Sequence, residues 1–67
     1  MRIVSKSRNH FHGWLKGGEI DIQREPDGGF YIIVKWKDGG YLYDGWAPET
    51  VRTMREAKRE AIRGAQL

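Results

Sequence analysis

The stretch EIDIQREPDGGFYIIVKWKDGGYLYDGW, residues 19–46, decides the fold class of this chain. Its first part alternates Ile20 and Ile22 with polar residues, which is the period-two pattern of a half-buried strand. Two turn signals, PDGG at 26–29 and DGG at 38–40, flank a run rich in β-branched and aromatic residues. The stretch therefore predicts an antiparallel meander of three strands.

Alternation along these strands assigns their side chains to two faces of the sheet. The more apolar face is expected to carry Ile20, Ile22, Phe30, Ile32, Val34, Leu42 and Trp46. The opposite face is expected to carry Tyr31, Ile33, Lys35, Lys37, Tyr41 and Tyr43, together with Glu19, Asp21 and Gln23 of the first strand. The apolar face needs a covering element.

Residues 48–64 are expected to supply that cover as a turn followed by a helix. The sequence TMRE at 53–56 is a capping box, in which a threonine and a glutamate satisfy the first free amides of a helix. Gly64 is a typical helix end, and the apolar side of the helix is mostly alanine. The predicted fold is α+β, a three-stranded antiparallel sheet with one C-terminal helix packed across one face.

Residues 1–18 are expected to form an irregular basic and aromatic segment. Gly13 and the glycines that follow it interrupt regular structure. Ile3 and Val4 would allow the stretch from Arg2 to Ser5 to add a fourth strand at the sheet edge. Phe11 and Trp14 would then serve as additional apolar cover.

Length and composition limit the range of functions. A chain of 67 residues has room for one domain with a thin core. It contains no cysteine, which excludes disulfides, thiolate zinc sites and cysteine nucleophiles. No apolar run approaches the roughly 20 residues that span a bilayer, so a cytoplasmic protein without membrane contact is expected. The net charge is +3, and its basic and acidic residues alternate in blocks along the chain.

Two histidines, His10 and His12, stand at a spacing that places both rings on one face of a strand. A zinc site needs three or four ligands, and the remaining ones would have to be carboxylates such as Asp44 or Glu19. We therefore expect these imidazoles to lie beside Phe11 and Trp14 without a metal. The chain also lacks HExxH, GxSxG and P-loop motifs, which predicts a protein that is not an enzyme and needs no cofactor.

Two surfaces of the predicted fold would suit nucleic acid. On the open sheet face, tyrosines alternate with lysines, as stacking and phosphate contacts require, although the acidic first strand would repel phosphate. The alternative is that these tyrosines form a second small apolar cluster. The other surface is a row of helix arginines, Arg52, Arg55, Arg59 and Arg63. Glutamates at helical spacing would pair with that row, and a solvated helix face is the alternative there.

Three strands followed by a helix that opens on TMREA, residues 53–57, resemble two kinds of DNA-binding domain. They are the plant ethylene-response-factor domains and the arm-binding domains of transposon and phage integrases. The resemblance covers residues 19–64 and depends on the strands FYIIVKW at 30–36 and YLY at 41–43. It implies that the sheet enters the major groove, with contacts from Lys35, Lys37, Tyr31 and Tyr43 and with Arg24 at a strand end. The strands lack the arginines of those families, and the loop at 44–52 is longer.

The sequence thus predicts a non-enzymatic DNA-binding module that uses the open sheet face and the basic N-terminal segment, with duplex DNA as the expected ligand. The expected contact residues are Lys35, Lys37, Tyr31, Tyr43, Arg24, Arg8 and Lys16. The alternative is a protein-interaction module, such as an inhibitor or adaptor, that uses Trp14, Tyr31, Tyr41 and Tyr43. Unpaired sheet edges would also allow a homodimer. The chain is similar in size to small phage or prophage accessory proteins.

Overall fold

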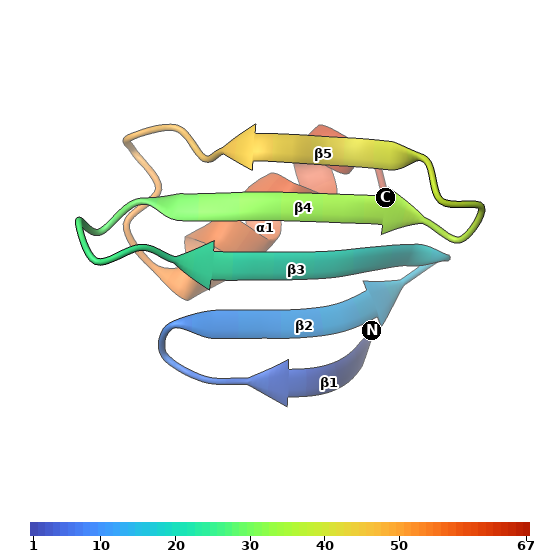
Figure 1. Cartoon of the computed structure of the whole chain (residues 1–67), viewed down its shortest axis with the longest axis horizontal. Helices are drawn as coiled ribbons and strands as arrows, with labels where there is room; N and C mark the ends of the chain where they lie inside the picture. Colours follow the sequence, from blue (N-terminus) through green and yellow to red (C-terminus); the bar gives the residue numbers. More distant parts are fainter.

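The computed structural model describes residues 1–67 as one five-stranded antiparallel sheet with one C-terminal helix. The elements are β1 (Arg2–Lys6), β2 (His10–Leu15), β3 (Gly18–Arg24), β4 (Phe30–Trp36), β5 (Tyr41–Trp46) and α1 (Met54–Ala65). The strands lie side by side in chain order, with α1 behind them (Figure 1). The predicted α+β class and the meander are confirmed. The sheet has five strands, whereas three, or at most four, were predicted.

The prediction of an irregular segment over residues 1–18 was wrong, because these residues form β1, β2 and the turn into β3. Gly13 lies inside β2, at a position that has no room for a side chain. A Cβ atom at this position would lie 2.9 Å from the carbonyl oxygen of Arg2 and 3.0 Å from the ring of Phe11. Lys16 and Gly17 then adopt φ angles of 52° and 86°. Two successive residues with positive φ are typical of the tight turn that joins β2 to β3.

A bulge in β5 changes the predicted faces of that strand. Val34 pairs with Tyr43 but the next residue, Lys35, pairs with Tyr41, so Leu42 has no partner on β4. The extra residue turns Tyr43 toward α1 and Trp46 away from it. Leu42 is 38% exposed and Trp46 is 58% exposed, so the prediction that both belong to the core was wrong.

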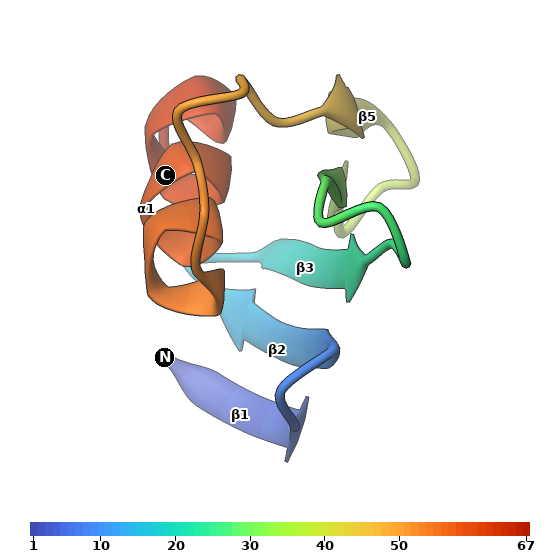
Figure 2. The ribbon, with the colours of Figure 1, turned by 90° about the vertical axis from the view of Figure 1, so that its left-hand side faces the viewer.

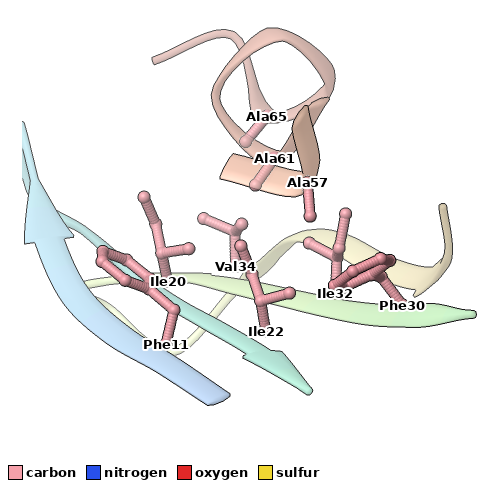
Figure 3. Close-up of a cluster of buried hydrophobic side chains, with 9 residues drawn as sticks. All are labelled: Phe11, Ile20, Ile22, Phe30, Ile32, Val34, Ala57, Ala61 and Ala65. Atoms are coloured by element: carbon pink, nitrogen blue, oxygen red, sulfur yellow. The ribbon is translucent and has the colours of Figure 1, made fainter. Parts of the chain in front are cut away.

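The core lies between the sheet and α1 (Figure 3). Its buried members are Phe11, Ile20, Ile22, Phe30, Ile32, Val34, Ala57, Ala61 and Ala65. The large buried side chains come from β2, β3 and β4, and the buried residues of α1 are all alanines, which lets the helix backbone approach the sheet closely. The predicted core residues of the first two meander strands are confirmed. Phe11, which was expected to serve as additional apolar cover, belongs to this core.

The helix begins as predicted and ends one residue later than predicted. The Thr53 hydroxyl accepts from the Glu56 amide at 3.1 Å, and a Glu56 carboxylate oxygen accepts from the Thr53 amide at 3.1 Å. Residues 48–53 precede the helix, with a turn in which the Val51 amide donates to Pro48. Gly64 lies inside α1, and Gln66 provides the left-handed cap. The ring of Tyr43 occupies the space that a side chain at position 64 would need.

Seen along the sheet, α1 lies on one side only, so the opposite side of the sheet has no covering element (Figure 2). We call that uncovered side the open face. The Tyr43 hydroxyl donates to Glu60 of α1 at 2.8 Å, which ties β5 to the helix. Burial of the ring and this hydrogen bond raise the pKa of Tyr43 to about 12. No helix of the chain is long and apolar enough to span a membrane.

Candidate nucleic-acid interface

The strand register places one residue from each strand in a continuous row across the open face. Directly opposed residues of antiparallel strands point to the same face, so each pairing extends the row. Tyr41 pairs with Lys35, Lys35 with Glu19, Glu19 with Trp14, and Trp14 with Arg2. We call this set, Arg2, Trp14, Glu19, Lys35 and Tyr41, the basic row. It alternates cations and aromatic rings around a single carboxylate.

Two further lysines lie at the end of the sheet next to the basic row. The Lys37 amide donates to the carbonyl of Gly17 at 3.0 Å, so the turn that carries Lys16 and the residue after β4 are in contact. The Lys37 ammonium lies 5.6 Å from the centre of the Trp36 ring, and the Lys35 ammonium lies 5.8 Å from that of Tyr41. Arg2, Lys16, Lys35 and Lys37 therefore gather at one end of the sheet, which we call the basic end.

Each histidine on the open face is paired with a carboxylate of the neighbouring strand. His12 Nε2 lies 2.7 Å from Glu19 Oε2, and His10 Nε2 lies 3.2 Å from both carboxylate oxygens of Asp21. Because an ionised carboxylate can only accept, the imidazole N–H groups donate in both pairs. The second oxygen of Glu19, Oε1, makes no hydrogen bond within the chain. No group of three or more His, Cys, Asp or Glu residues is arranged to hold a metal ion.

A third carboxylate on the open face accepts a hydrogen bond from a tyrosine. The Tyr31 hydroxyl donates to Asp44 at 2.7 Å, and this hydrogen bond is the main cause of a raised pKa for Tyr31. The Tyr31 ring also meets Trp46 edge to face, with the ring centres 5.2 Å apart. The aromatic pair lies toward the end of the sheet away from the basic end. The aromatic pair and the basic row therefore lie toward opposite ends of the open face.

A shallow hollow of about 270 Å³ lies on the open face beside the basic row. It is lined by Glu19, Asp21, Ile33, Lys35 and Tyr41. Its lining thus combines an apolar residue, an aromatic ring that is 61% exposed, one cation and two carboxylates. This arrangement can receive a flat, partly polar group.

The structure brings only part of the predicted contact set together. Lys35 and Tyr31 lie on the open face, and Lys16 and Lys37 lie at the basic end. The other three residues lie elsewhere and are Tyr43, Arg24 and Arg8. Tyr43 faces α1, so its assignment to the open face was wrong, because the bulge at Leu42 reverses the alternation in β5.

Arg8 and Arg24 lie at the end of the sheet opposite the basic end. Arg8 belongs to the turn between β1 and β2, and both arginines line a hollow with Glu25. The Arg24 guanidinium lies 5.7 Å from the centre of the Phe30 ring, on the side of the sheet that faces α1. These two arginines therefore cannot act together with Lys35 on one face.

The helix arginines form a separate surface. Arg52, Arg55, Arg59 and Arg63 are all exposed, whereas the alanines on the other side of α1 face the sheet. Arg63 donates to Glu60 at 2.7 Å, which lowers the pKa of that carboxyl and raises the pKa of the guanidinium. Because α1 covers the side opposite the open face, this surface and the basic row point in different directions (Figure 2).

The predicted contact set does not include Arg2, Trp14 or Tyr41, although Tyr41 was expected on the open sheet face. Arg2 was placed in a separate edge strand or arm, and Trp14 in an irregular stretch. The signal that would have found them is the two-residue turn Lys16-Gly17, which fixes the pairing of Trp14 with Glu19 and extends the sheet toward Arg2. Comparison of the chain with protein-family models, characterised proteins and solved structures finds no significant match.

Proposed function

We propose that this protein is a non-enzymatic nucleic-acid-binding module that uses the basic end of the open face. The observation that supports it is the basic row, which places Trp14 and Tyr41 beside Arg2 and Lys35 on an uncovered sheet. Aromatic rings stack on bases and cations contact phosphates, and an open sheet presents both at once. A cytoplasmic location, where nucleic acid is accessible, belongs to the same proposal.

The acidic residues of the open face do not remove this support. Glu19 and Asp21 each accept a hydrogen bond from a histidine, and Asp44 accepts one from Tyr31. The basic end itself carries four cations, Arg2, Lys16, Lys35 and Lys37, against the acidic side chains of Glu19 and Asp38. The Lys16 ammonium also donates to the C-terminal residue, Leu67, at 3.5 Å. Asp38 accepts from the Gly40 amide at 2.9 Å within its own turn. A phosphate backbone would therefore meet net positive charge at this end.

The proposal is tested by reversing one charge on each side of the molecule. Lys35→Glu should weaken binding of a labelled oligonucleotide at least about tenfold, because it removes an attraction and adds a repulsion. Arg55→Glu on α1 is the matched control and should change affinity less than about twofold. Fluorescence anisotropy measures both, and circular dichroism checks that each variant is folded. Equal losses in the two variants would contradict a specific role of the basic end, and a larger loss in Arg55→Glu would move the interface to α1.

The salt dependence of the binding constant is a second test of the same interface. Each contacted phosphate of a single strand contributes a slope of about −0.7 to the dependence of log K on log salt. Four cations at the basic end therefore predict a total slope of roughly −2 to −3. A nuclear magnetic resonance titration of labelled protein should show shifts at the basic row that fade as salt rises. Absence of shifts at low salt would contradict the proposal.

Protein interaction is the second candidate, and the exposed edge of β5 supports it. Tyr41, Leu42 and Trp46 are all exposed on this strand, and only β4 pairs with it. A hollow of about 400 Å³ lies at one end of the strand, where Trp36 and Leu67 line it together with Tyr41 and Leu42. An added strand from a partner or from a second copy would cover these side chains. Such an interface would weaken much less with salt than phosphate binding.

A further inference from the structure

We infer that the ligand of the open face is single-stranded, and that the hollow beside the basic row selects a base that carries an exocyclic amino group. This inference rests on the proposed function and specifies its ligand. It accounts for a feature that the general proposal leaves unused, namely two carboxylates next to the residues that would contact phosphate. Cytosine, adenine and guanine are bases of this kind, and thymine and uracil are not.

The width of the sheet argues against a duplex groove. Neighbouring strands lie about 4.8 Å apart, so the four spacings between β1 and β5 separate the outer backbones by about 19 Å. The major groove of B-DNA is only about 12 Å wide. A three-stranded sheet, as expected from the sequence, would be much narrower. Five strands cannot enter the groove face-on, whereas an unpaired strand can lie across them.

The aromatic residues of the basic row suit unstacked bases. Tyr41 is 61% exposed, and its ring borders the hollow. The Lys35 ammonium lies over one face of that ring, 5.8 Å from the ring centre, which leaves the other face for a base. A base stacked on Tyr41 would therefore have its phosphate near a cation. Trp14 offers a second ring two strands beyond Lys35. Bases inside a duplex are not available for stacking of this kind.

The carboxylates determine which base fits the hollow. Glu19 Oε1 is free to accept a hydrogen bond, because His12 holds the other oxygen at 2.7 Å. Asp21 lines the same hollow and is itself held by His10. Ionised carboxylates only accept hydrogen bonds, so they attract the amino groups of cytosine, adenine and guanine. Thymine presents a carbonyl oxygen at the corresponding position and would be repelled.

The experiment compares three labelled ligands at low salt and neutral pH by fluorescence anisotropy: an oligo(dC), an oligo(dT) of equal length and a mixed-sequence duplex. We expect oligo(dC) to bind at least about 5-fold more tightly than oligo(dT), since one base contact of this kind discriminates by at least that factor. We also expect the better single strand to bind more tightly than the duplex.

Two variants, each with a control, connect the binding and its selectivity to the hollow. Glu19→Gln should reduce the preference for oligo(dC) to less than about twofold, mainly by improving oligo(dT) binding, because the repulsive charge is lost. Asp44→Asn is the matched control, since this carboxylate lies on the same face but outside the hollow and is occupied by Tyr31. It should leave the preference unchanged. Tyr41→Ala should weaken both single strands about tenfold, and Tyr41→Phe should not.

The outcomes separate this inference from the proposed function. Tighter binding of the duplex, or equal binding of oligo(dC) and oligo(dT), overturns the inference but leaves nucleic-acid binding in place. No binding of any of the three ligands at low salt overturns the proposed function and the inference together. A preference for oligo(dC) that survives Glu19→Gln overturns the role of the hollow.

Discussion

The two faces of the sheet follow different physical rules. On the covered face, every large side chain at the centre is apolar and fully buried, and it packs against alanines of α1 (Figure 3). On the open face, the same strands carry hydrogen-bonded pairs of polar residues, such as His12 with Glu19, that remain partly exposed. Apolar burial is worth about 25 cal/mol per Å², whereas exposed ion pairs contribute about 0–1 kcal/mol. The covered face therefore stabilises the fold, and the open face is free to serve binding.

The sharpest way to break this comparison is to shorten two neighbouring residues of β4 that point to opposite faces. Ile32 is fully buried, and Ile33 is only partly covered. Ile32→Ala should lower the free energy of unfolding by about 2–5 kcal/mol, which would unfold much of a domain this small. Ile33→Ala should cost less than about 1.5 kcal/mol. Urea unfolding followed by circular dichroism measures both, and similar losses would contradict the division between the faces.

A smaller effect is expected where β5 meets α1. Alanine normally stabilises a helix interior by about 1 kcal/mol relative to glycine. At position 64 the Tyr43 ring occupies the space of the new methyl group, so Gly64→Ala should instead destabilise the protein by about 1–3 kcal/mol. In a Tyr43→Ala background the same change should become neutral or stabilising. This double-mutant cycle fails if Gly64→Ala raises the melting temperature of the otherwise unchanged protein.

Local patterns in the sequence were sufficient for the faces of β3 and β4 and for the start of α1, but not for β1, β2 and β5. The alternation in residues 19–36 and the capping box identified β3, β4 and the start of α1, because each depends on neighbours along the chain. The basic row depends on pairings across five strands, and one bulge at Leu42 reverses the orientation of Tyr43. A bulge is a tertiary compromise between the edge strand and the helix, and alternation alone does not show it.

Two glycines are the second reason why parts of the fold could not be predicted from the sequence. Gly13 and Gly64 were interpreted as signals that end regular structure. Both lie inside regular elements, where a neighbouring ring needs the space of the missing side chain: Phe11 in the first case and Tyr43 in the second. A glycine that provides space and a glycine that ends an element are identical in a single sequence. Only the packing partner distinguishes them.

Loss of the helix cap should lower the stability of the protein less than a truncation in the core does, but more than the loss of an exposed ion pair. Thr53→Ala removes the hydroxyl that accepts from the Glu56 amide and should lower stability by about 1 kcal/mol. Thr53→Ser keeps that acceptor and serves as the control, with a change of less than about 0.5 kcal/mol. Thermal unfolding of the two variants distinguishes them. Equal melting temperatures would show that the cap contributes nothing to the stability of α1.

The smallest change in stability is expected when the pH is lowered, because two carboxylates of α1 then gain protons. The pKa of Glu56 is lowered mainly by the hydrogen bond from the Arg52 amide, and the pKa of Glu60 mainly by Arg63. In the unfolded chain both groups return to the ordinary value of 4.5. A lowered pKa in the folded state stabilises the protein above that value, and this contribution is lost as the pH falls below it.

Melting temperatures should therefore show a contribution from these groups that is constant from neutral pH to about pH 5 and declines below pH 4.5. Glu56→Gln should make the acid decline shallower, because one of the two groups no longer gains a proton on unfolding. Glu49→Gln, in the exposed loop before α1, is the control and should leave the slope unchanged. An unchanged slope in Glu56→Gln would assign the acid sensitivity to the other carboxylates.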